Sequence, residues 1–542
     1  MRTMRVFVLL MALASFACGA ESPQAGDASA PYKVEEVALG PMPSGIIGTT
    51  VSRDGCHVAF VLAKGDKLFV VIDGQAGPEY DGILVNTPVF SPDGKRVAYG
   101  AQKGGKWCVV LDGQAGPEYD GIGKGSPIFS PDGKRVAYGA GKGGKQLVVL
   151  DGQAGPAYDG IVERGPVFSP DGKRAAYVAG KGGRQLVVVD GQAGPEFDGI
   201  GKGDPVFSPD GKRVAYGAAK GGKQLVVIDG QPGPEFDGIG KGDPVFSPDG
   251  ERAAYGALRA GKWCVILDGQ AGPEYDGVGD IVFSPDGRRV AYGAQKGDKQ
   301  FVVIDGQAGP EYAGVGAGLL FSPDGQRVAY AAKRGDKILV VIDGEAGPEY
   351  DGLLNTAVFS PDGKRVAYGA QKGDKGFVVI DGQEGPAYDG IGDLLLSPHG
   401  KRVVYAAHRG DKWCVVIDGQ AGPEYDAIGA GSLLFSPEGK RVGYRARKGD
   451  KWLVVLEGEA GPEYDGIGEP GAVFSQDGKR VAYKALRADK WCVVVDGQAG
   501  PVYDALTKGG PVFRPDGTVE YLAFKARTLV RVKHVPREAN DQ

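Results

Sequence analysis

Apolar residues recur along this chain in short runs, and the same run returns about every 39 residues. In the segment R-V-A-Y-G-A (96–101), large Val97 and Tyr99 alternate with small Ala98 and Gly100, and none of the four is charged. A strand with one solvated face alternates apolar with polar residues instead. The pattern therefore predicts a strand with both faces buried, as in a sheet that is packed between two others.

The sequence pattern of each repeat unit predicts four short strands separated by turn residues. The strand Pro88 to Ser91 ends in a Ser-Pro-Asp-Gly turn, whose proline and glycine suit a type I turn. After the second strand, the glycine pair of K-G-G-K (103–106) suits a two-residue hairpin. Trp107 to Asp112 follows as the third strand, and Glu118 to Ile122 as a weak fourth one. Four antiparallel strands in about 40 residues are typical of a β-propeller blade, whereas β-solenoid coils are shorter and parallel.

The Ser-Pro-Asp-Gly turn or a variant of it occurs thirteen times at intervals of 37 to 39 residues, which leaves no room for a separate domain. The turns begin at Ser52, Ser91, Ser130, Ser169, Ser208, Ser247, Ser284, Ser322, Ser360, Ser397, Ser436, Ser475 and Arg514. Lys33 to Leu39 precedes the first turn as a lone strand, and only three strands follow the last turn: Pro511 to Phe513, Val519 to Lys525, and Leu529 to Val535. We expect the two ends of the chain to complete one shared blade.

The number of blades raises the question of one ring or two. Propellers ordinarily have four to eight blades, and thirteen in one ring would leave a wide, poorly filled channel. We therefore expect an all-β chain with two rings of six and seven blades. The connector shortens at Val278 to Ile281, so the expected halves are 33–280 and 281–535, the last blade being completed by strand 33–39. One oversized ring is the alternative, which the shared terminal blade favours.

The N-terminus is typical of an export signal. Arg2 and Arg5 accompany an apolar stretch, Val6 to Phe16, that is too short to span a bilayer. Cleavage after Ala20 would remove a signal peptide (1–20) and leave a flexible spacer (21–32), and residues 536–542 form a tail. Lipid attachment at Cys18 is the alternative, although the preceding residues match a lipobox poorly. The mature chain has no segment long and apolar enough to cross a membrane. Because of the export signal we expect a periplasmic or extracellular protein, which would be anchored by lipid if Cys18 is lipidated.

Composition narrows the function classes further. Hydrophobic content of 42% and charged content of 24% fit a globular protein, and a formal charge of −5 gives no electrostatic case for nucleic-acid binding. The cysteines do not form a disulfide framework. Four of them occupy one repeat position in non-neighbouring units, too far apart for a bond that needs Cα atoms within roughly 7 Å. We expect them to be free and buried: Cys108, Cys264, Cys414 and Cys492.

The decapeptide F-S-P-D-G-K-R-V-A-Y (Phe90 to Tyr99) closely resembles the WD-like repeats of the TolB-type propeller family. The resemblance extends from about Ile46 to Val535. It implies the propeller fold but no single function, because such repeats occur in periplasmic scaffolds, in surface proteins and as gating domains of peptidases. The separate α/β domain of TolB and the hydrolase domain of the peptidases have no counterpart in this chain, so their partners and activity are not carried over.

The sequence offers little for catalysis. His399 and His408 lie at opposite ends of one predicted strand, and His57 and His534 lie near the ends of the array. No H-E-x-x-H, paired C-x-x-C or G-x-S-x-G motif occurs. The recurring carboxylates are spread along D-G-Q-A-G-P-E-Y-D, and turns explain them better than calcium ligation does. We therefore predict no enzymatic activity, no cofactor and no metal site.

The second hairpin of every complete unit carries two cations. In a propeller these hairpin tips share one face with the connectors between blades, so the pattern predicts a ring of positive charge that would attract anions. The competing interpretation is that lysines keep the tips soluble and prevent edge-to-edge association. The candidate binding residues are Lys103, Lys106, Lys142, Lys145, Lys181, Arg184, Lys220, Lys223, Lys296, Lys299, Lys372 and Lys375.

Repetition itself favours binding over catalysis, because catalysis needs unlike residues that converge at one place. The leading hypothesis is a non-enzymatic scaffold that binds a protein partner in the cell envelope. A propeller that binds carbohydrate or another cell-wall polymer is the alternative, and an enzyme with an unrecognised site is the weakest hypothesis.

Overall fold

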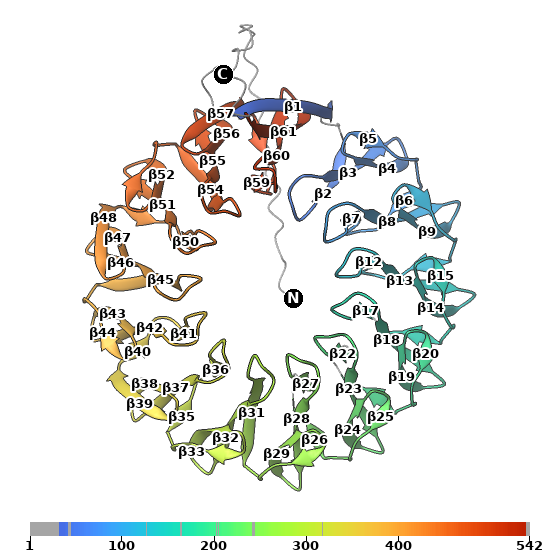
Figure 1. Cartoon of the computed structure of the whole chain (residues 1–542). Helices are drawn as coiled ribbons and strands as arrows, with labels where there is room; N and C mark the ends of the chain where they lie inside the picture. Colours follow the sequence, from blue (N-terminus) through green and yellow to red (C-terminus); the bar gives the residue numbers. More distant parts are fainter. Residues whose placement is uncertain are drawn as a thin grey trace.

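The computed structural model describes residues 32–41, 45–125, 127–162, 165–201, 203, 205–240, 244–316 and 318–537. In these residues every regular element is a β-strand, and the strands form thirteen antiparallel sheets around one axis (Figure 1). The prediction of a β-propeller with thirteen four-stranded blades is confirmed. We number the blades 1 to 13 in the order of their second strands along the chain.

The second and third strands form the central hairpin of each blade. The second strands are β3 (Val58–Lys64), β8 (Val97–Lys103), β13 (Val136–Lys142), β18 (Ala175–Lys181), β23 (Val214–Lys220), β28 (Ala253–Arg259), β32 (Val290–Lys296), β37 (Val328–Arg334), β42 (Val366–Lys372), β46 (Val403–Arg409), β51 (Val442–Lys448), β55 (Val481–Arg487) and β60 (Val519–Lys525). The third strands are β4 (Lys67–Ile72), β9 (Lys106–Leu111), β14 (Lys145–Leu150), β19 (Arg184–Val189), β24 (Lys223–Ile228), β29 (Lys262–Leu267), β33 (Lys299–Ile304), β38 (Lys337–Ile342), β43 (Lys375–Ile380), β47 (Lys412–Ile417), β52 (Lys451–Leu456), β56 (Lys490–Val495) and β61 (Thr528–Pro536).

The first strand of each blade lies nearest the axis of the ring (Figure 1). In blades 1, 7, 10 and 12 it is continuous: β2 (Ile46–Val51), β31 (Gly277–Phe283), β45 (Gly390–Leu396) and β54 (Gly466–Phe474). In the other blades it is split into two short segments: β6 (Gly82–Ile83) and β7 (Val89–Phe90), β11 (Gly121–Ile122) and β12 (Ile128–Phe129), β16 (Gly160–Ile161) and β17 (Val167–Phe168), β21 (Gly199–Ile200) and β22 (Val206–Phe207), β26 (Gly238–Ile239) and β27 (Val245–Phe246), β35 (Gly314–Val315) and β36 (Leu320–Phe321), β40 (Gly352–Leu353) and β41 (Val358–Phe359), β49 (Ala427–Ile428) and β50 (Leu434–Phe435), β58 (Ala505–Leu506) and β59 (Val512–Phe513).

The fourth strand forms the outer edge of each blade. It has six residues in β39 (Glu345–Tyr350), β48 (Gln420–Tyr425) and β57 (Gln498–Tyr503), and ten in β1 (Tyr32–Pro41), which belongs to blade 13. It has two residues in β5 (Gln75–Ala76), β10 (Gln114–Ala115), β15 (Gln153–Ala154), β20 (Gln192–Ala193), β25 (Gln231–Pro232), β30 (Gln270–Ala271), β34 (Gln307–Ala308), β44 (Gln383–Glu384) and β53 (Glu459–Ala460).

One predicted strand boundary was wrong. The segment Glu118 to Ile122 was expected to be a single fourth strand, but only Tyr119 pairs with its own blade, through one bridge to Trp107. Gly121 and Ile122 pair with β13 of the next blade instead. The backbone amide of Asp120 already bonds to Gly141 O of that blade, so the chain changes sheets at this residue.

The core consists of apolar layers between neighbouring blades. In blade 2, Tyr99 packs with blade 1, where its ring lies 6.2 Å from that of Tyr80 in an edge-to-face arrangement. Ala98 of the same strand faces blade 3 and packs near Tyr138. Because large residues face one neighbour and small residues the other, the second strand of each blade is buried on both sides as predicted.

All thirteen blades stand in one ring, so the prediction of two rings was wrong. Across the proposed boundary near residue 280, Ala254 of blade 6 packs with Tyr292 of blade 7 in an ordinary interblade layer. The last layer joins Leu522 of blade 13 to Phe60 of blade 1. The interfaces repeat nearly the same residues, so none is weak enough to end a ring. Closure occurs only where the two ends of the chain meet.

The predicted closure through a shared blade is confirmed. β1 pairs antiparallel with β61 from Tyr32 opposite Pro536 to Pro41 opposite Thr528. The hydroxyl of Tyr32 donates to Val495 O of blade 12 at 2.8 Å. This N-terminal strand therefore ties the first residues of the described chain to its last two blades.

His534 lies fully buried in the closing blade, beneath β1. Its Nε2 lies 3.0 Å from the hydroxyl of Tyr521, and its Nδ1 has no hydrogen-bond partner in the part of the chain that the structure describes. Burial, together with the charge of Arg480, lowers the pKa of His534 from 6.5 to about 4. The folded protein therefore holds this imidazole neutral at pH values where the unfolded chain protonates it.

We expect His534 to make the closing blade acid-sensitive. A histidine whose pKa is lowered by folding binds fewer protons in the folded state, so stability falls as the pH drops from 6.5 toward 4, by about 3 kcal/mol at the lower end. Urea unfolding at pH 7 and pH 4.5 should show a loss about 2 kcal/mol smaller for His534→Phe than for the wild type. An equal loss in both proteins would contradict this assignment.

A recurring arginine links each blade to the next. In blade 2, Arg96 Nε donates to Asp112 Oδ2 at 2.9 Å, and its NH1 donates to Lys134 O of blade 3 at 2.6 Å. The guanidinium also lies 5.6 Å from the ring centroid of Phe129 in blade 3. The same arrangement recurs around much of the ring, for example at Arg213.

Replacing one of these arginines should loosen one interface. Arg96→Ala removes a bond to the next blade and a cation–π contact, and because the side chain is part-exposed we expect a cost of about 1 kcal/mol. Lys95→Ala is the matched control, since this neighbouring cation forms no ion pair among the described residues. Urea unfolding measures both, and equal effects would show that Arg96 adds nothing beyond its charge.

Candidate functional site

The candidate lysines lie on the face formed by the hairpins between second and third strands and by the connectors between blades, here called the hairpin face. Lys106 shows how the hairpin cations are held. Its Nζ donates to Asp120 Oδ1 at 2.6 Å, and Asp120 Oδ2 accepts from the Gly143 amide of the next hairpin at 2.7 Å. The Lys106 ammonium and this amide hold the pKa of Asp120 below its ordinary value.

Most of the twelve candidate cations have a carboxylate partner on the same face. Lys106, Lys145, Lys223 and Lys375 pair with Asp120, Asp159, Asp237 and Asp389. Lys181, Lys220 and Lys372 pair with Glu196, Glu235 and Glu384, and Lys299 lies 3.9 Å from Asp298. Within the described part of the chain, no ion pair is formed by Lys103, Lys142, Arg184 or Lys296. The hairpin face is thus a mosaic of both charges, and its role in binding stays a prediction.

The carboxylates of the opposite face are bound within turns, as the sequence predicts. Asp93 Oδ1 accepts from Ser91 Oγ at 2.6 Å and from the Lys95 amide at 3.2 Å. Asp112 Oδ1 accepts from the Val97 amide at 2.9 Å. Among the residues with described positions, no group of three or more His, Cys, Asp or Glu could hold a metal ion.

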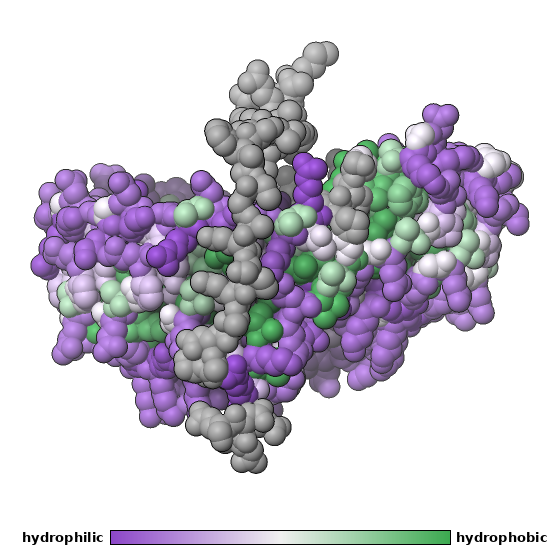
Figure 2. All heavy atoms as spheres, turned by 90° about the horizontal axis from the view of Figure 1, so that it is seen from above, coloured by the Kyte–Doolittle hydropathy of each residue, from purple (hydrophilic) through white to green (hydrophobic). Residues whose placement is uncertain are grey.

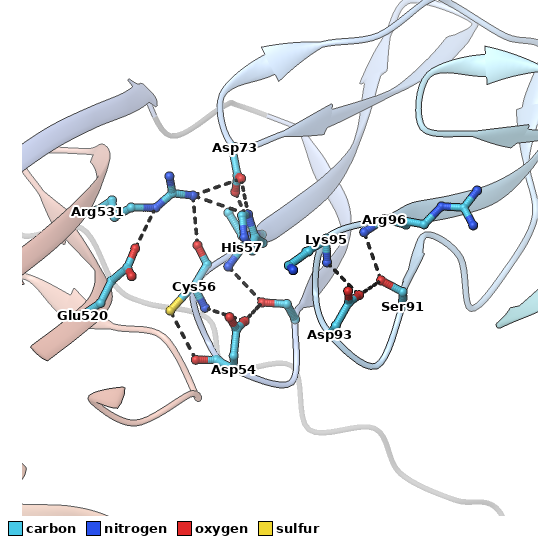
Figure 3. A network of polar contacts seen from close by, with 12 residues as sticks. Asp54, Cys56, His57, Asp73, Ser91, Asp93, Lys95, Arg96, Glu520 and Arg531 are labelled. Carbon is cyan, nitrogen blue, oxygen red and sulfur yellow. Dashed lines mark hydrogen bonds and ion pairs between the residues drawn. The ribbon is translucent and has the colours of Figure 1, made fainter. Parts of the chain in front are cut away.

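A polar network spans the closure between blades 13 and 1, and it brings Cys56, His57 and Asp73 together (Figure 3). His57 Nδ1 lies 2.6 Å from Asp73 Oδ2, and Arg531 of β61 donates to the same oxygen at 3.1 Å. The hydrogen bond with Asp73 raises the pKa of His57. Sequence reasoning missed this cluster, because Arg531 is separated from the other three residues by almost the whole chain.

The arrangement resembles a cysteine nucleophile with its base, but the thiol is not activated. Cys56 Sγ points to Asp54 O at 3.4 Å rather than to the ring of His57 (Figure 3). Cys56 is buried, and its burial raises the thiol pKa to about 12. A reactive cysteine needs a lowered pKa and access to substrate. The network therefore joins the two ends of the ring, where His57 takes the position that Arg96 has in blade 2.

The free and buried state expected for the cysteines is confirmed. Cys56, Cys108, Cys264, Cys414 and Cys492 are all buried and unpaired. Cys18 lies outside the described residues.

Most of the strongly exposed large apolar side chains lie on the inner wall, which we define as the first strands together with the loops that lead into them or join their two segments. Seven large aliphatic residues are strongly exposed in the described chain. Two lie in fourth strands at the outer edge, Val37 in β1 and Val502 in β57. The five on the inner wall are Ile47, Val85, Val162, Val206 and Leu354. The inner wall also varies most between blades, whereas the hairpins and turns repeat.

A cavity of about 420 Å³ opens on the inner wall between blades 7 and 8. It lies at the shortened connector around Asp280, and glycines such as Gly293 and Gly316 leave the space. Its amide side chains are already engaged: Gln300 Oε1 accepts from the Val315 amide at 2.8 Å. The cavity shows that the inner wall is uneven, but it contains no cluster of titratable groups.

Two buried cations break the repeat in blades 11 and 12. At the fourth residue of the second strand, the other blades have a small or aliphatic side chain: Val61, Gly100, Gly139, Val178, Gly217, Gly256, Gly293, Ala331, Gly369, Ala406 and Leu522. Blade 11 has Arg445 and blade 12 has Lys484, and both are nearly buried. Sequence reasoning missed them, although a cation in a row of glycines is visible once the units are aligned.

Arg445 reaches from blade 11 to the first strand of blade 12. Its NH1 donates to Ile467 O at 3.4 Å, and its NH2 lies 3.2 Å from Glu469 Oε1. The guanidinium lies 5.5 Å from the ring centroid of Trp452, and its Nε is buried without a hydrogen-bond partner among the described residues. The guanidinium therefore keeps unused donors.

Lys484 makes the equivalent contact one blade further on. Its Nζ contacts Lys508 O and Gly509 O of blade 13, each at 3.5 Å, and no carboxylate lies within ion-pair distance among the residues described. A Cβ on Gly468 would lie 2.8 Å from Cε of Lys484. Desolvation lowers the pKa of Lys484, and the charge of Glu469 opposes that shift.

Similarity to known proteins is limited to distant solved structures. No protein-family model matches this chain, and no curated protein is significantly similar to it. The chain shares 15% identity with TolB from Acinetobacter baumannii, over 48% of this chain and 64% of that one, with a TM-score of 0.22. It shares 14% with the β-propeller domain of the Trilobed protease from Pyrococcus furiosus (48% and 94%, TM-score 0.25) and 13% with a eukaryotic initiation factor (68% and 96%, TM-score 0.32). Matches this distant carry no argument about function, and membership of the TolB-type family stays a prediction.

The predicted signal peptide (1–20), nearly all of the spacer (21–32) and most of the tail (536–542) lie outside the described residues. The described elements include no helix that is long and apolar enough to cross a membrane.

Proposed function

We propose that this chain is a non-enzymatic, exported scaffold that binds a protein partner along the inner wall of its ring. The single observation that carries the proposal is the concentration of exposed aliphatic side chains there. Val85 is 79% exposed, Ile47 60% and Leu354 38%. The five residues stand one to a blade, in blades 1, 2, 4, 5 and 9, so the partner we propose extends along the wall instead of covering one compact patch.

The two flat faces of the ring are less suited to an apolar partner. Seen edge-on, hydrophilic residues cover both faces of the disc, and the apolar residues visible between them belong to its outer side (Figure 2). The hairpin face repeats the same ion pairs from blade to blade, which offers a partner little to distinguish one position from another. The inner wall differs between blades, so it can provide specificity.

Carbohydrate binding is less well supported. Aromatic rings present broad apolar faces with a polar tip, which suits them to stacking against ligands. In the described chain the strongly exposed large apolar residues are all aliphatic, and the aromatic side chains are buried or half-buried. Aliphatic contacts favour a polypeptide partner.

The proposed compartment is the cell envelope or the outside of the cell. The proposal depends on the apolar stretch Val6 to Phe16 with its flanking arginines. Fractionation of cells that express the full chain with a C-terminal tag tests it. A shortened product outside the cytoplasm is expected, and a full-length cytoplasmic product would contradict export.

Site-specific photo-cross-linking tests the binding surface. A photoreactive amino acid replaces Val85 or Leu354 on the inner wall, and in control proteins it replaces Lys103 on the hairpin face or Gln114 on the outer edge. We expect the same cross-linked protein from both inner-wall positions and none from the controls. Cross-links only from Lys103 or Gln114, or none from any position, would contradict the proposal.

A further inference from the structure

The two buried cations of blades 11 and 12 need an explanation that the fold does not supply. Eleven blades pack without a charge at this position. A buried charge without full compensation costs folding free energy, and replacing it with a small apolar residue often stabilises a protein. Lys484 is 9% exposed, and among the described residues its ammonium has only two long contacts, both to carbonyl oxygens. Perturbed and incompletely paired groups of this kind cluster at functional sites.

Both cations converge on one short segment of the inner wall. Arg445 approaches β54 from blade 11, through Ile467 O and Glu469. Lys484 passes Gly468 of β54 on its way to blade 13. Lys508, whose carbonyl oxygen Lys484 contacts, lies in the loop between β58 and β59 of blade 13, and its own side chain is exposed. Arg445 therefore contacts the Glu469 carboxylate directly, and the charge of the same carboxylate also acts on Lys484.

We propose that Arg445 and Lys484 form a receptor for carboxylate groups of an acidic polypeptide segment that lies along the inner wall, and that Glu469 occupies this receptor in the free protein. The Glu469 side chain is 84% exposed while its partner Arg445 is 12% exposed. A carboxylate on the open wall that contacts a buried guanidinium can swing away and leave its place to another carboxylate. The NH2 group of Arg445, which donates to Glu469 in the free protein, is then available for a charge-assisted hydrogen bond to the incoming carboxylate.

A polypeptide fits this receptor better than a polyanionic glycan. The cations are few and enclosed, whereas a glycan with a charge on every unit would need a long exposed track. Neighbouring parts of the inner wall expose aliphatic side chains such as Leu354 and Ile47. A segment that combines acidic with apolar residues would match both features.

This inference rests on the proposed function, since it names the chemistry of the protein partner. The two can nevertheless fail separately. If cross-linking from Val85 and Leu354 captures a partner but acidic peptides do not bind, the receptor is wrong and the scaffold stands. If acidic peptides bind through Arg445 but nothing is cross-linked, the scaffold proposal fails and the receptor stands.

The test is fluorescence anisotropy with the full chain and a labelled peptide of alternating glutamate and valine, with a glutamine–valine peptide as the neutral control. Arg445→Ala and Lys484→Ala introduce the residue that blades 8 and 10 have at this position, so folding should be preserved. We expect each to weaken binding about tenfold or more, because each removes charge-assisted contacts. Lys103→Ala makes the same change in charge on the hairpin face and should alter binding less than twofold.

Glu469→Gln separates a receptor from a purely structural ion pair. If Glu469 occupies the receptor, the variant should bind the acidic peptide several times more tightly than the wild type. Tighter binding is not expected if Glu469 merely braces Arg445. Three outcomes would overturn the inference: no binding by either the wild type or Glu469→Gln, weaker binding by Glu469→Gln, or a loss in Lys103→Ala equal to that in Lys484→Ala. Binding of heparin but not of the peptide, lost in Lys484→Ala, would also overturn it.

Discussion

Removing residues 32–41 should open the ring between blades 13 and 1 and destabilise the last two blades by well over 3 kcal/mol. Tyr32 is 5% exposed and packs with residues of blades 12 and 13, and truncating a buried aromatic side chain alone costs about 3 kcal/mol or more. The deletion also leaves the edge of β61 unpaired along its length. Glu36 would no longer accept from the hydroxyl of Tyr503, a bond of 2.8 Å.

Thermal unfolding by circular dichroism and limited proteolysis measure this effect. We expect the deletion variant to show a lower first transition and early cleavage within blades 12 and 13. Tyr32→Phe is the mild control, since it keeps the ring and loses only the hydrogen bond to Val495 O. Unchanged melting after the deletion would contradict closure by the N-terminal strand.

Deleting one whole unit should be tolerated far better than deleting part of one. Removing residues 205–243 joins Asp204 to Pro244 and recreates the Asp-Pro junction found at 204–205. In the deletion variant blade 6 packs against blade 4, and Tyr255 and Ala257 take the positions that Tyr216 and Ala218 occupy in the wild type. The angle between blades would change from roughly 28° to 30°, a small adjustment shared by all interfaces.

The matched deletion is residues 214–228, which removes β23 and β24 and leaves the rest of blade 5. It exposes the apolar layers of blades 4 and 6 without providing a replacement. We expect it to be insoluble or to lose its cooperative transition, whereas the whole-unit deletion stays folded. Equal loss of β structure in the two variants, measured by circular dichroism, would contradict the modular account.

Most of the fold could be predicted because its information is local and repeated. Each Ser-Pro-Asp-Gly turn and each hairpin glycine pair marks a strand end, and Gly94 does take the positive φ (72°) that the turn needs. The two segments of the first strand could not be predicted, because Gly121–Ile122 is too short for any periodicity and its partner lies in the next blade. The number of rings depends on the small angle between neighbouring blades. The interfaces between blades are chemically nearly identical, and no single residue encodes this angle.

The candidate site was less predictable than the fold. The hairpin lysines were identified by counting cations, but their neutralisation depends on carboxylates about fourteen residues away, as for Lys106 and Asp120. Arg445 and Lys484 carry a clear sequence signal, a charge where the other units have glycine or an aliphatic residue. The role of these two side chains depends on the face of the strand that they occupy. Only the sheet topology establishes that they point toward the next blade.

The measurement that tests this account most directly is electron cryomicroscopy of the isolated mature protein. The inner wall, the closure by β1 and the cationic receptor all require one continuous ring. We expect class averages of a single closed ring with thirteen spokes. Particles made of two smaller discs with six and seven spokes would contradict it.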